Sequence, residues 1–124
     1  MLAEADIKRI AADIVRAGPR LAVGVFGSYG VGAQRARSDL DLFVIADTPL
    51  PPAARRREIQ RVLFAVLHPL DIHVFTPEEF EAEAYEHLSF AWVIVRQARL
   101  YHWTAEARRR VPSLHAAMTG AGAT

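Results

Sequence analysis

Three aspartates have residue types and spacing that suit catalysis. Asp39 and Asp41 are separated by one residue in an apolar segment, and Asp71 is the second residue of the apolar run LDIHVF. Side chains at positions i and i+2 of a strand point to the same face, so Asp39 and Asp41 are expected to lie side by side. Neighbouring carboxylates repel each other and lose hydration when buried, and a divalent cation relieves both effects. The spacing therefore predicts a magnesium site, because Mg²⁺ prefers carboxylate oxygens.

Asp71 completes this site if its strand pairs with the strand of the other two acids. Three carboxylates can hold two ions roughly 3.5–4 Å apart, one activating an attacking oxygen and one stabilising a leaving group. Two plainer interpretations stay open. In the first, Asp39 and Asp41 accept hydrogen bonds from backbone amides at a sheet edge. In the second, Asp71 is exposed and interacts with an arginine or a helix end. His73 shares the face of Asp71, and a partly buried histidine with a structural hydrogen bond is its plainer interpretation.

Gly27-Ser28 directly follows the apolar run LAVGVF. A glycine permits unusual dihedral angles and close approach of the backbone to a ligand. Backbone N–H groups of such a turn, together with the Ser28 hydroxyl, suit phosphate oxygens. Taken alone, the pair is equally well explained as a tight turn without a ligand, and only its combination with the acids favours phosphate binding.

Strands and helices must position these residues. Short apolar runs predict strands over 21–26, 39–46 and 70–75, and a short last strand over 99–103. Helical spacing predicts helices over 2–16, 53–67, 77–87 and 89–98, with one helical turn after Ser28. The third of these helices opens with a capping box at Thr76 and Pro77. The order predicts an α/β (α+β) fold in which helices pack against a small mixed sheet.

Two helices carry further expectations. In the helix over 53–67 the pattern predicts an apolar stripe opposite a solvated arginine face; the stripe is Ile59, Val62, Leu63, Val66 and Leu67, and the face is Arg55, Arg56, Arg57 and Arg61. The helix over 89–98 is apolar on several sides, through Phe90, Trp92, Val93 and Ile94. Such a helix is central to a core or meets a partner, which is either another protein or a second copy of the chain.

The 124 residues fit one domain, expected over 1–112, and the Gly/Ala-rich residues 113–124 are expected to form a flexible tail. The chain has no cysteine, which excludes disulfides and favours a cytoplasmic protein. Neither a signal peptide nor an apolar run long enough to span a membrane is recognisable. A formal net charge of +1 argues against a nucleic-acid partner.

The segment GSYGVGAQRARSDLDL matches the pattern G-S-x10-D-x-D. With this pattern the chain resembles the minimal nucleotidyltransferase (MNT) family of the DNA polymerase β-like superfamily. LDIHVFTPEEF is similar to the strand and helix around the third aspartate of that family, and VRQARLYHW is similar to its closing segment. The resemblance covers about residues 7 to 103 and implies the nucleotidyltransferase fold.

The resemblance also implies roles for individual residues. Gly27 and Ser28 would contact the triphosphate of ATP, and Arg35 falls where the family commonly keeps an arginine. The metal ligands would be Asp39, Asp41 and Asp71, holding two Mg²⁺ ions, and Asp71 would also help to deprotonate the acceptor. Val31 departs from the family, since many members have Arg or Lys at that position.

Members of this family typically act as MntA-type antitoxins. The resemblance thus implies transfer of AMP from ATP to a tyrosine hydroxyl of a HEPN-domain toxin, which silences the toxin. The alternative is a non-catalytic module of the same fold that neutralises its partner by contact, and Val31 keeps that alternative open.

Overall fold

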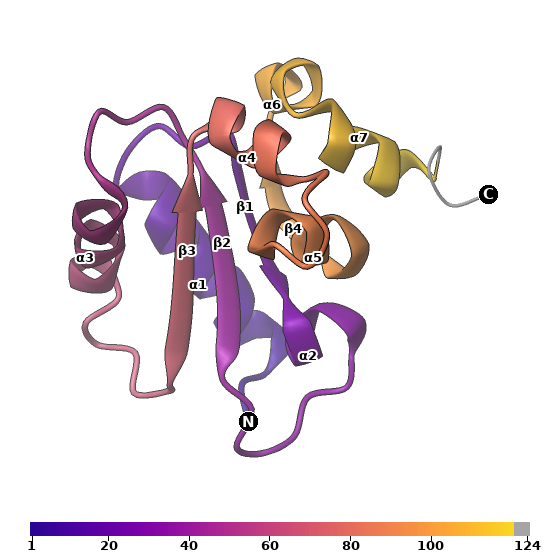
Figure 1. The fold of residues 1–124 in the computed structure, drawn as a ribbon. Helices are drawn as coiled ribbons and strands as arrows, with labels where there is room; N and C mark the ends of the chain where they lie inside the picture. The colour runs from indigo at the N-terminus through magenta and orange to yellow at the C-terminus, as the bar shows by residue number, and fades with distance from the viewer. Residues whose placement is uncertain (121–124) are drawn as a thin grey trace.

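Four strands form a single mixed sheet in the computed structural model, which describes residues 1–120. The strands are β1 (Ala22–Phe26), β2 (Leu40–Ile45), β3 (Leu70–Phe75) and β4 (Arg99–Trp103), in the order β3-β2-β1-β4 (Figure 1). β1 is antiparallel to both β2 and β4, whereas β2 and β3 are parallel. The expected α/β class with a small mixed sheet is confirmed.

The parallel pair decides which residues meet at one end of the sheet. Helix α3 (Pro52–Val62) connects β2 to β3, because parallel neighbours need a long crossover. Both strands then begin at the same end, and the register pairs Asp41 with Asp71. β1 runs the opposite way and ends there, so its last residue, Phe26, pairs with Asp41.

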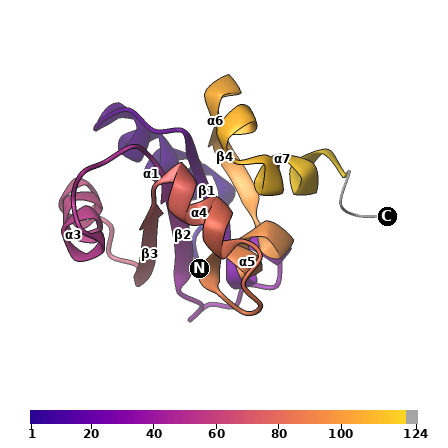
Figure 2. The same ribbon diagram turned by 45° about the horizontal axis from the view of Figure 1, so that its top comes forward.

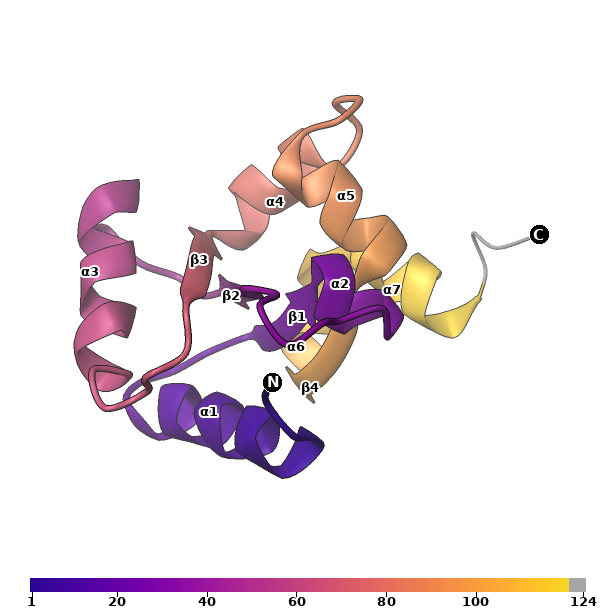
Figure 3. The ribbon, with the colours of Figure 1, turned by 90° about the horizontal axis from the view of Figure 1, so that it is seen from below.

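Helices cover both faces of the sheet. Helix α1 (Glu4–Arg16) and α3 cover the first face, as seen from below in Figure 3. Alternate residues of β2 point to this face, where they form a core with the apolar sides of the two helices. Members of that core include Ile7, Ile14, Val25, Leu40, Leu42, Val44 and Ile59, all at most 1% exposed.

The second face carries α4 (Pro77–Glu83), α5 (Phe90–Gln97), α6 (Ala105–Arg110) and α7 (Pro112–Thr119). Helix α2 (Gly27–Val31) directly follows β1, and its Tyr29 packs in the core of the first face. Figure 2 shows α6 and α7 after β4, next to α4 and α5. Phe43 and Ile45 point to this face from β2 and are fully buried. Within the described residues, the helices are too short or too polar to cross a bilayer.

Most expected elements are present, with differences at their ends. The helical turn after β1 is α2, and Thr76 caps α4 through the expected box with Glu79, with Pro77 in the first turn. α4 ends at Glu83, four residues before the expected end, because a turn at 84–85 precedes α5. The strand expected over 70–75 has those bounds in the structure.

The expected flexible tail at 113–124 is wrong for residues 113–119, which belong to α7. Leu114 is fully buried there, so hydrophobic packing orders this segment despite its small residues. Residues 121–124 of the expected tail lie outside the described part of the chain. Neither α6 nor α7 was expected from the sequence.

The stripe and the arginine face expected for α3 need two corrections. Leu67 is 98% exposed instead of buried, because α3 ends at Val62 and the helical spacing stops there. Arg55 was placed on the solvated face but is only 8% exposed. Its guanidinium donates to both carboxylate oxygens of Glu79 on α4, at 2.6 and 3.2 Å, and this partner makes its burial tolerable.

Candidate active site

Two carboxylates face each other where β2 and β3 begin. Asp41 and Asp71 are register partners on neighbouring parallel strands, so their side chains point to the same face, the one that α5 covers. Asp41 is half-buried, and 53% of the Asp71 side chain is exposed. We call Asp41 and Asp71 the acidic pair. The strand adjacency on which the expected three-acid site depended is therefore present.

Electrostatics at the acidic pair disfavour two negative charges. Desolvation, and then the Asp71 carboxylate, raise the pKa of Asp41, and Asp39 and a hydrogen bond to Asp71 raise it further. His73 acts in the opposite direction. A partly buried carboxylate with acidic neighbours is stabilised by a proton or a cation. An adjacent positive charge would therefore stabilise the ionised form of Asp41.

Asp39 precedes β2 and is exposed. Its charge contributes to the negative potential at Asp41. Across residues 1–120, no three His, Asp or Glu side chains stand close enough to enclose a metal ion. These residues therefore suit a Mg²⁺ ion that takes one or two carboxylate ligands from the protein. Substrate phosphates and water would complete its coordination.

Gly27 lies directly against the acidic pair. Its φ is +65°, a value that L side chains rarely adopt, and a Cβ at this position would lie 2.1 Å from Oδ2 of Asp41. Any larger residue would push the Asp41 carboxylate out of place. Gly27 is thus required by the backbone conformation and by the acid beside it, and this links the G-S part of the motif to its D-x-D part.

The turn after Gly27 is anchored through its next residues. Ser28 is half-buried, and Tyr29 is fully buried, with its hydroxyl accepting from the N–H of Leu2 at 3.1 Å. N–H groups in the first turn of a helix lack partners within the helix, so those of Ser28 and Tyr29 suit an anionic ligand. Val31, at the end of α2, is 58% exposed and brings no charge.

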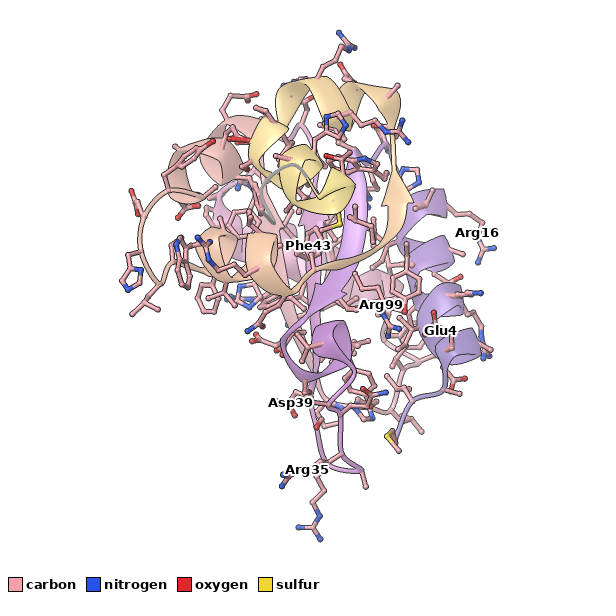
Figure 4. The ribbon with its side chains drawn as sticks, turned by 90° about the vertical axis from the view of Figure 1, so that its right-hand side faces the viewer. Glu4, Arg16, Arg35, Asp39, Phe43 and Arg99 are labelled. Carbon is pink, nitrogen blue, oxygen red and sulfur yellow. The ribbon has the colours of Figure 1, made fainter. Side chains whose placement is uncertain are left out.

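Arg35 lies in the loop between α2 and β2. Its N–H donates to the Ser38 hydroxyl at 2.8 Å, while its side chain is exposed. Figure 4 shows that this side chain points away from the body of the protein, beyond Asp39. The structure thus does not bring the Arg35 guanidinium to the acidic pair, and a contact with triphosphate would require the loop to move.

His73 lies beside Asp71 on the same face of β3. Its Nε2 is 3.1 Å from Oδ2 of Asp71, and its ring packs against Phe26 and Phe90, at centroid distances of 5.4 and 4.2 Å. The histidine is partly buried and hydrogen-bonded, as expected, but its partner is a residue of the candidate site. A cavity of about 410 Å³ begins at His73 and Phe90 and extends between α3 and α4.

Gln97 also touches the candidate site, although the sequence did not indicate it. The Gly27 N–H donates to Oε1 of this residue over 3.0 Å, linking two positions 70 residues apart. A single glutamine at the end of an apolar helix carries no recognisable pattern. Only the arrangement of α2 beside α5 brings it to the turn.

A family model described as "Nucleotidyltransferase domain" matches residues 7–101 of the chain. The matched segment runs from α1 to β4 and includes every residue of the G-S-x10-D-x-D motif and Asp71. The search among curated proteins found no match.

Solved structures with a similar fold include three informative ones. A toxin–antitoxin with AMP-PNP aligns with a TM-score of 0.56 at 19% identity, covering 91% of this chain and 90% of that chain. A putative nucleotidyltransferase from Sulfolobus solfataricus gives 0.54 at 21%, covering 81% and 78%. A tri-AMPylated Shewanella oneidensis HEPN toxin in complex with MNT antitoxin gives 0.53 at 18%, covering 93% and 85%.

At these identities the structural likeness shows the fold, and it agrees with the family match. The match spans most of the described chain and includes the strands that carry the acidic pair and the turn that carries Gly27. This chain belongs to the nucleotidyltransferase domain family.

Proposed function

We propose that this nucleotidyltransferase transfers AMP from ATP to a tyrosine hydroxyl of a HEPN-domain toxin in the cytoplasm, and so acts as its antitoxin. The observation that carries the proposal is the contact between Gly27 and Asp41, beside Asp71. It joins a turn suited to phosphate and a carboxylate pair suited to cations. Nucleotidyl transfer from a metal-bound triphosphate needs both in one place.

In this proposal Asp41 and Asp71 bind Mg²⁺, and Asp39 joins them when the triphosphate supplies further oxygens. Two ions suit three carboxylates, and they would neutralise the charge on the triphosphate and its leaving group. Gly27 and Ser28 contact the triphosphate through the turn, and Arg35 approaches it from the loop. The raised pKa of Asp41 supports this assignment, because it reports the demand for positive charge.

The proposed reaction forms one bond and breaks one. The tyrosine oxygen attacks the α-phosphorus in line with the bond to the bridging α–β oxygen, and that bond breaks to release pyrophosphate. Asp71, the more exposed of the acidic pair, accepts the proton of the hydroxyl. The chain contributes mainly the positioning of the reactants and the neutralisation of charge.

The acceptor assignment comes from similarity. One structure of similar fold is an MNT antitoxin with a tri-AMPylated HEPN toxin, and another is a toxin–antitoxin with AMP-PNP. The cavity beside His73 and Phe90 opens next to the strand that carries Asp71 and has room for part of an acceptor. We therefore place the acceptor on the β3 side of the acidic pair.

A labelling experiment tests this function. The full chain is incubated with Mg²⁺ and ATP labelled at the α-phosphate, with and without a candidate HEPN-domain protein. We expect label on the HEPN protein from the wild type and none from an Asp39→Ala, Asp41→Ala double variant. Asp47→Ala is the matched control, since Asp47 follows the opposite end of β2 and pairs with Arg110.

Label transfer that survives the double substitution would overturn the assignment of the acids. In a parallel reaction, the ATP is labelled at the γ-phosphate. Label on the HEPN protein in that reaction would show that AMP is not the transferred group, because AMP transfer releases the γ-phosphate within pyrophosphate. Mass spectrometry of the labelled HEPN protein decides whether the modified residue is a tyrosine.

A second candidate function is a non-catalytic module that neutralises its partner by contact. Two observations favour it. Val31 is an exposed apolar residue where many family members have a cation, and no three His, Asp or Glu side chains among residues 1–120 form a group that could hold a metal ion. Neutralisation of the toxin by the Asp39→Ala, Asp41→Ala variant, without label transfer, would support this function over the enzymatic one.

A further inference from the structure

We propose that Gln97 is a positioning residue for the nucleotide-binding turn, acting through the backbone of Gly27. The inference rests on the proposed function and extends it to a residue outside the G-S-x10-D-x-D motif. Gln97 is the last residue of α5, and its side chain reaches α2 from outside the motif. It would set the orientation of the turn on which triphosphate binding depends.

The first contact is the hydrogen bond from the Gly27 N–H to Oε1 of Gln97, at 3.0 Å. Gly27 has a positive φ and no Cβ to restrict its rotation, so it needs an external contact to fix its peptide plane. The amide oxygen supplies that contact. With the first N–H of the turn occupied, the groups that remain for phosphate are those of Ser28 and Tyr29.

Two further contacts join the same segment to α2. The backbone at Gln97 packs so closely on the turn that a Cβ at Gly30 would lie 2.3 Å from the Gln97 carbonyl oxygen. Two residues later, Nη2 of Arg99 donates to the Tyr29 carbonyl at 3.1 Å and lies 3.5 Å from Glu4 on α1. Figure 4 shows Arg99 beside the α2 turn, on the side of Glu4.

These contacts separate the role of Gln97 from that of the acids. Gln97 contacts the turn on the side of β1 and α5, whereas Asp41 contacts it on the side of β2. Loss of the Gln97 amide leaves the acidic pair in its register, because the pairing of β2 with β3 holds it. The expected consequence is weaker binding of ATP at an almost unchanged rate of transfer at saturation.

The test uses the full chain with Gln97→Met, which keeps the length of the side chain and removes the acceptor oxygen. Gln97→Glu keeps an acceptor for the Gly27 N–H and adds a negative charge beside the triphosphate. Gln60→Met is the matched control, because Gln60 is exposed on α3 at the other side of the sheet. Calorimetric binding of Mg-ATP, transfer kinetics and melting temperature are measured for each.

We expect Gln97→Met to raise Kd and KM for ATP about 3- to 10-fold, the range of one hydrogen bond, with kcat within about twofold of wild type. Gln97→Glu should keep the wild-type melting temperature. Its loss of ATP affinity relative to the wild type should be larger at low salt than at high salt, because salt screens the added charge. Gln60→Met should match the wild type. A wild-type KM in Gln97→Met, or a fall in kcat at unchanged KM, would overturn the positioning role.

The outcomes for the two proposals are separable. A wild-type chain that binds Mg-ATP but labels no acceptor contradicts the proposed transfer, while the Kd values still decide the role of Gln97. If Gln97→Met fails to fold, the binding and melting data of Gln97→Glu decide it. If Gln97→Glu binds Mg-ATP at low salt as tightly as the wild type does, the side chain of residue 97 does not lie beside the triphosphate.

Discussion

At the scale of single residues, Asp41 shows how a partly buried carboxylate beside other acids opposes stability. Its pKa in the folded protein lies above the ordinary 3.8, mainly because of desolvation and then Asp71. The folded state therefore binds the proton more tightly than the unfolded state does. The contribution of Asp41 to the free energy of unfolding should therefore be greatest below its ordinary pKa and should be lost as pH rises through the raised pKa.

We accordingly predict that Asp41→Asn melts at a higher temperature than the wild type at pH 7 in the absence of divalent cations. Near pH 3 the difference should vanish, because the wild-type carboxyl is then also neutral. Asp47→Asn should behave in the opposite way at pH 7, since a hydrogen bond from Arg110 lowers the pKa of Asp47. Thermal melts across this pH range check both variants, and equal destabilisation by both would contradict the electrostatic account.

Gly27 offers a second residue-scale prediction through comparison with Gly32. Both have positive φ, but a Cβ at Gly32 meets nothing within 4 Å, whereas one at Gly27 meets Asp41. We expect Gly32→Ala to lose about 1 kcal/mol of stability from backbone strain and to keep its activity. Gly27→Ala should lose more stability and, by displacing Asp41, reduce label transfer roughly tenfold or more. Equal transfer by the two variants would argue against the contact.

At the scale of elements, the ion pair between Arg55 and Glu79 joins α3 to α4. The hydrogen bond from Arg55 lowers the pKa of Glu79, so the pair stabilises the fold above the ordinary pKa of 4.5 and loses this contribution as pH falls through the lowered value. Loss of the carboxylate would leave the buried guanidinium short of a partner.

We predict that Glu79→Gln lowers the free energy of unfolding by about 1 kcal/mol at pH 7, a moderate value because Glu79 is 42% exposed and solvent screens the pair. Its neighbour Glu78 is 71% exposed and pairs with Arg110, so Glu78→Gln should change stability by less than about 0.5 kcal/mol. Urea unfolding at pH 7 and pH 3 measures both. A larger loss in Glu78→Gln would contradict the role given to Arg55.

The elements also show what could be predicted from the sequence. The alternation of residue types around Asp41 and the apolar run that begins at Leu70 are local patterns. Both predicted strands that the structure contains. The meeting of Asp41 with Asp71 required the parallel pairing, which the sequence allowed but did not determine. The burial of Arg55 was not predictable either, because it depends on Glu79 from a distant helix. Gln97 was missed for the same reason.

At the scale of the whole molecule, the candidate site is assembled from segments that are distant in the chain. The end of β1 and the starts of β2 and β3 supply the turn and the acidic pair, and the end of α5 supplies Gln97. Each segment has an apolar side in one of the two cores. The geometry of the site therefore depends on both layers of helices, including the last helix, which the sequence had suggested was a tail.

Helix α7 gives the prediction that tests this dependence. Leu114 is fully buried in the core of the second face, together with Ile94 of α5, whereas Met118 on the same helix is 37% exposed. We expect Leu114→Ala to lower the free energy of unfolding by about 2–4 kcal/mol, because it leaves a cavity. Met118→Ala should change it by less than about 0.5 kcal/mol. Chemical denaturation followed by tryptophan fluorescence measures both variants. If Leu114→Ala unfolds like Met118→Ala, the domain ends near residue 112, and α7 is an appendage that the α5 layer does not need.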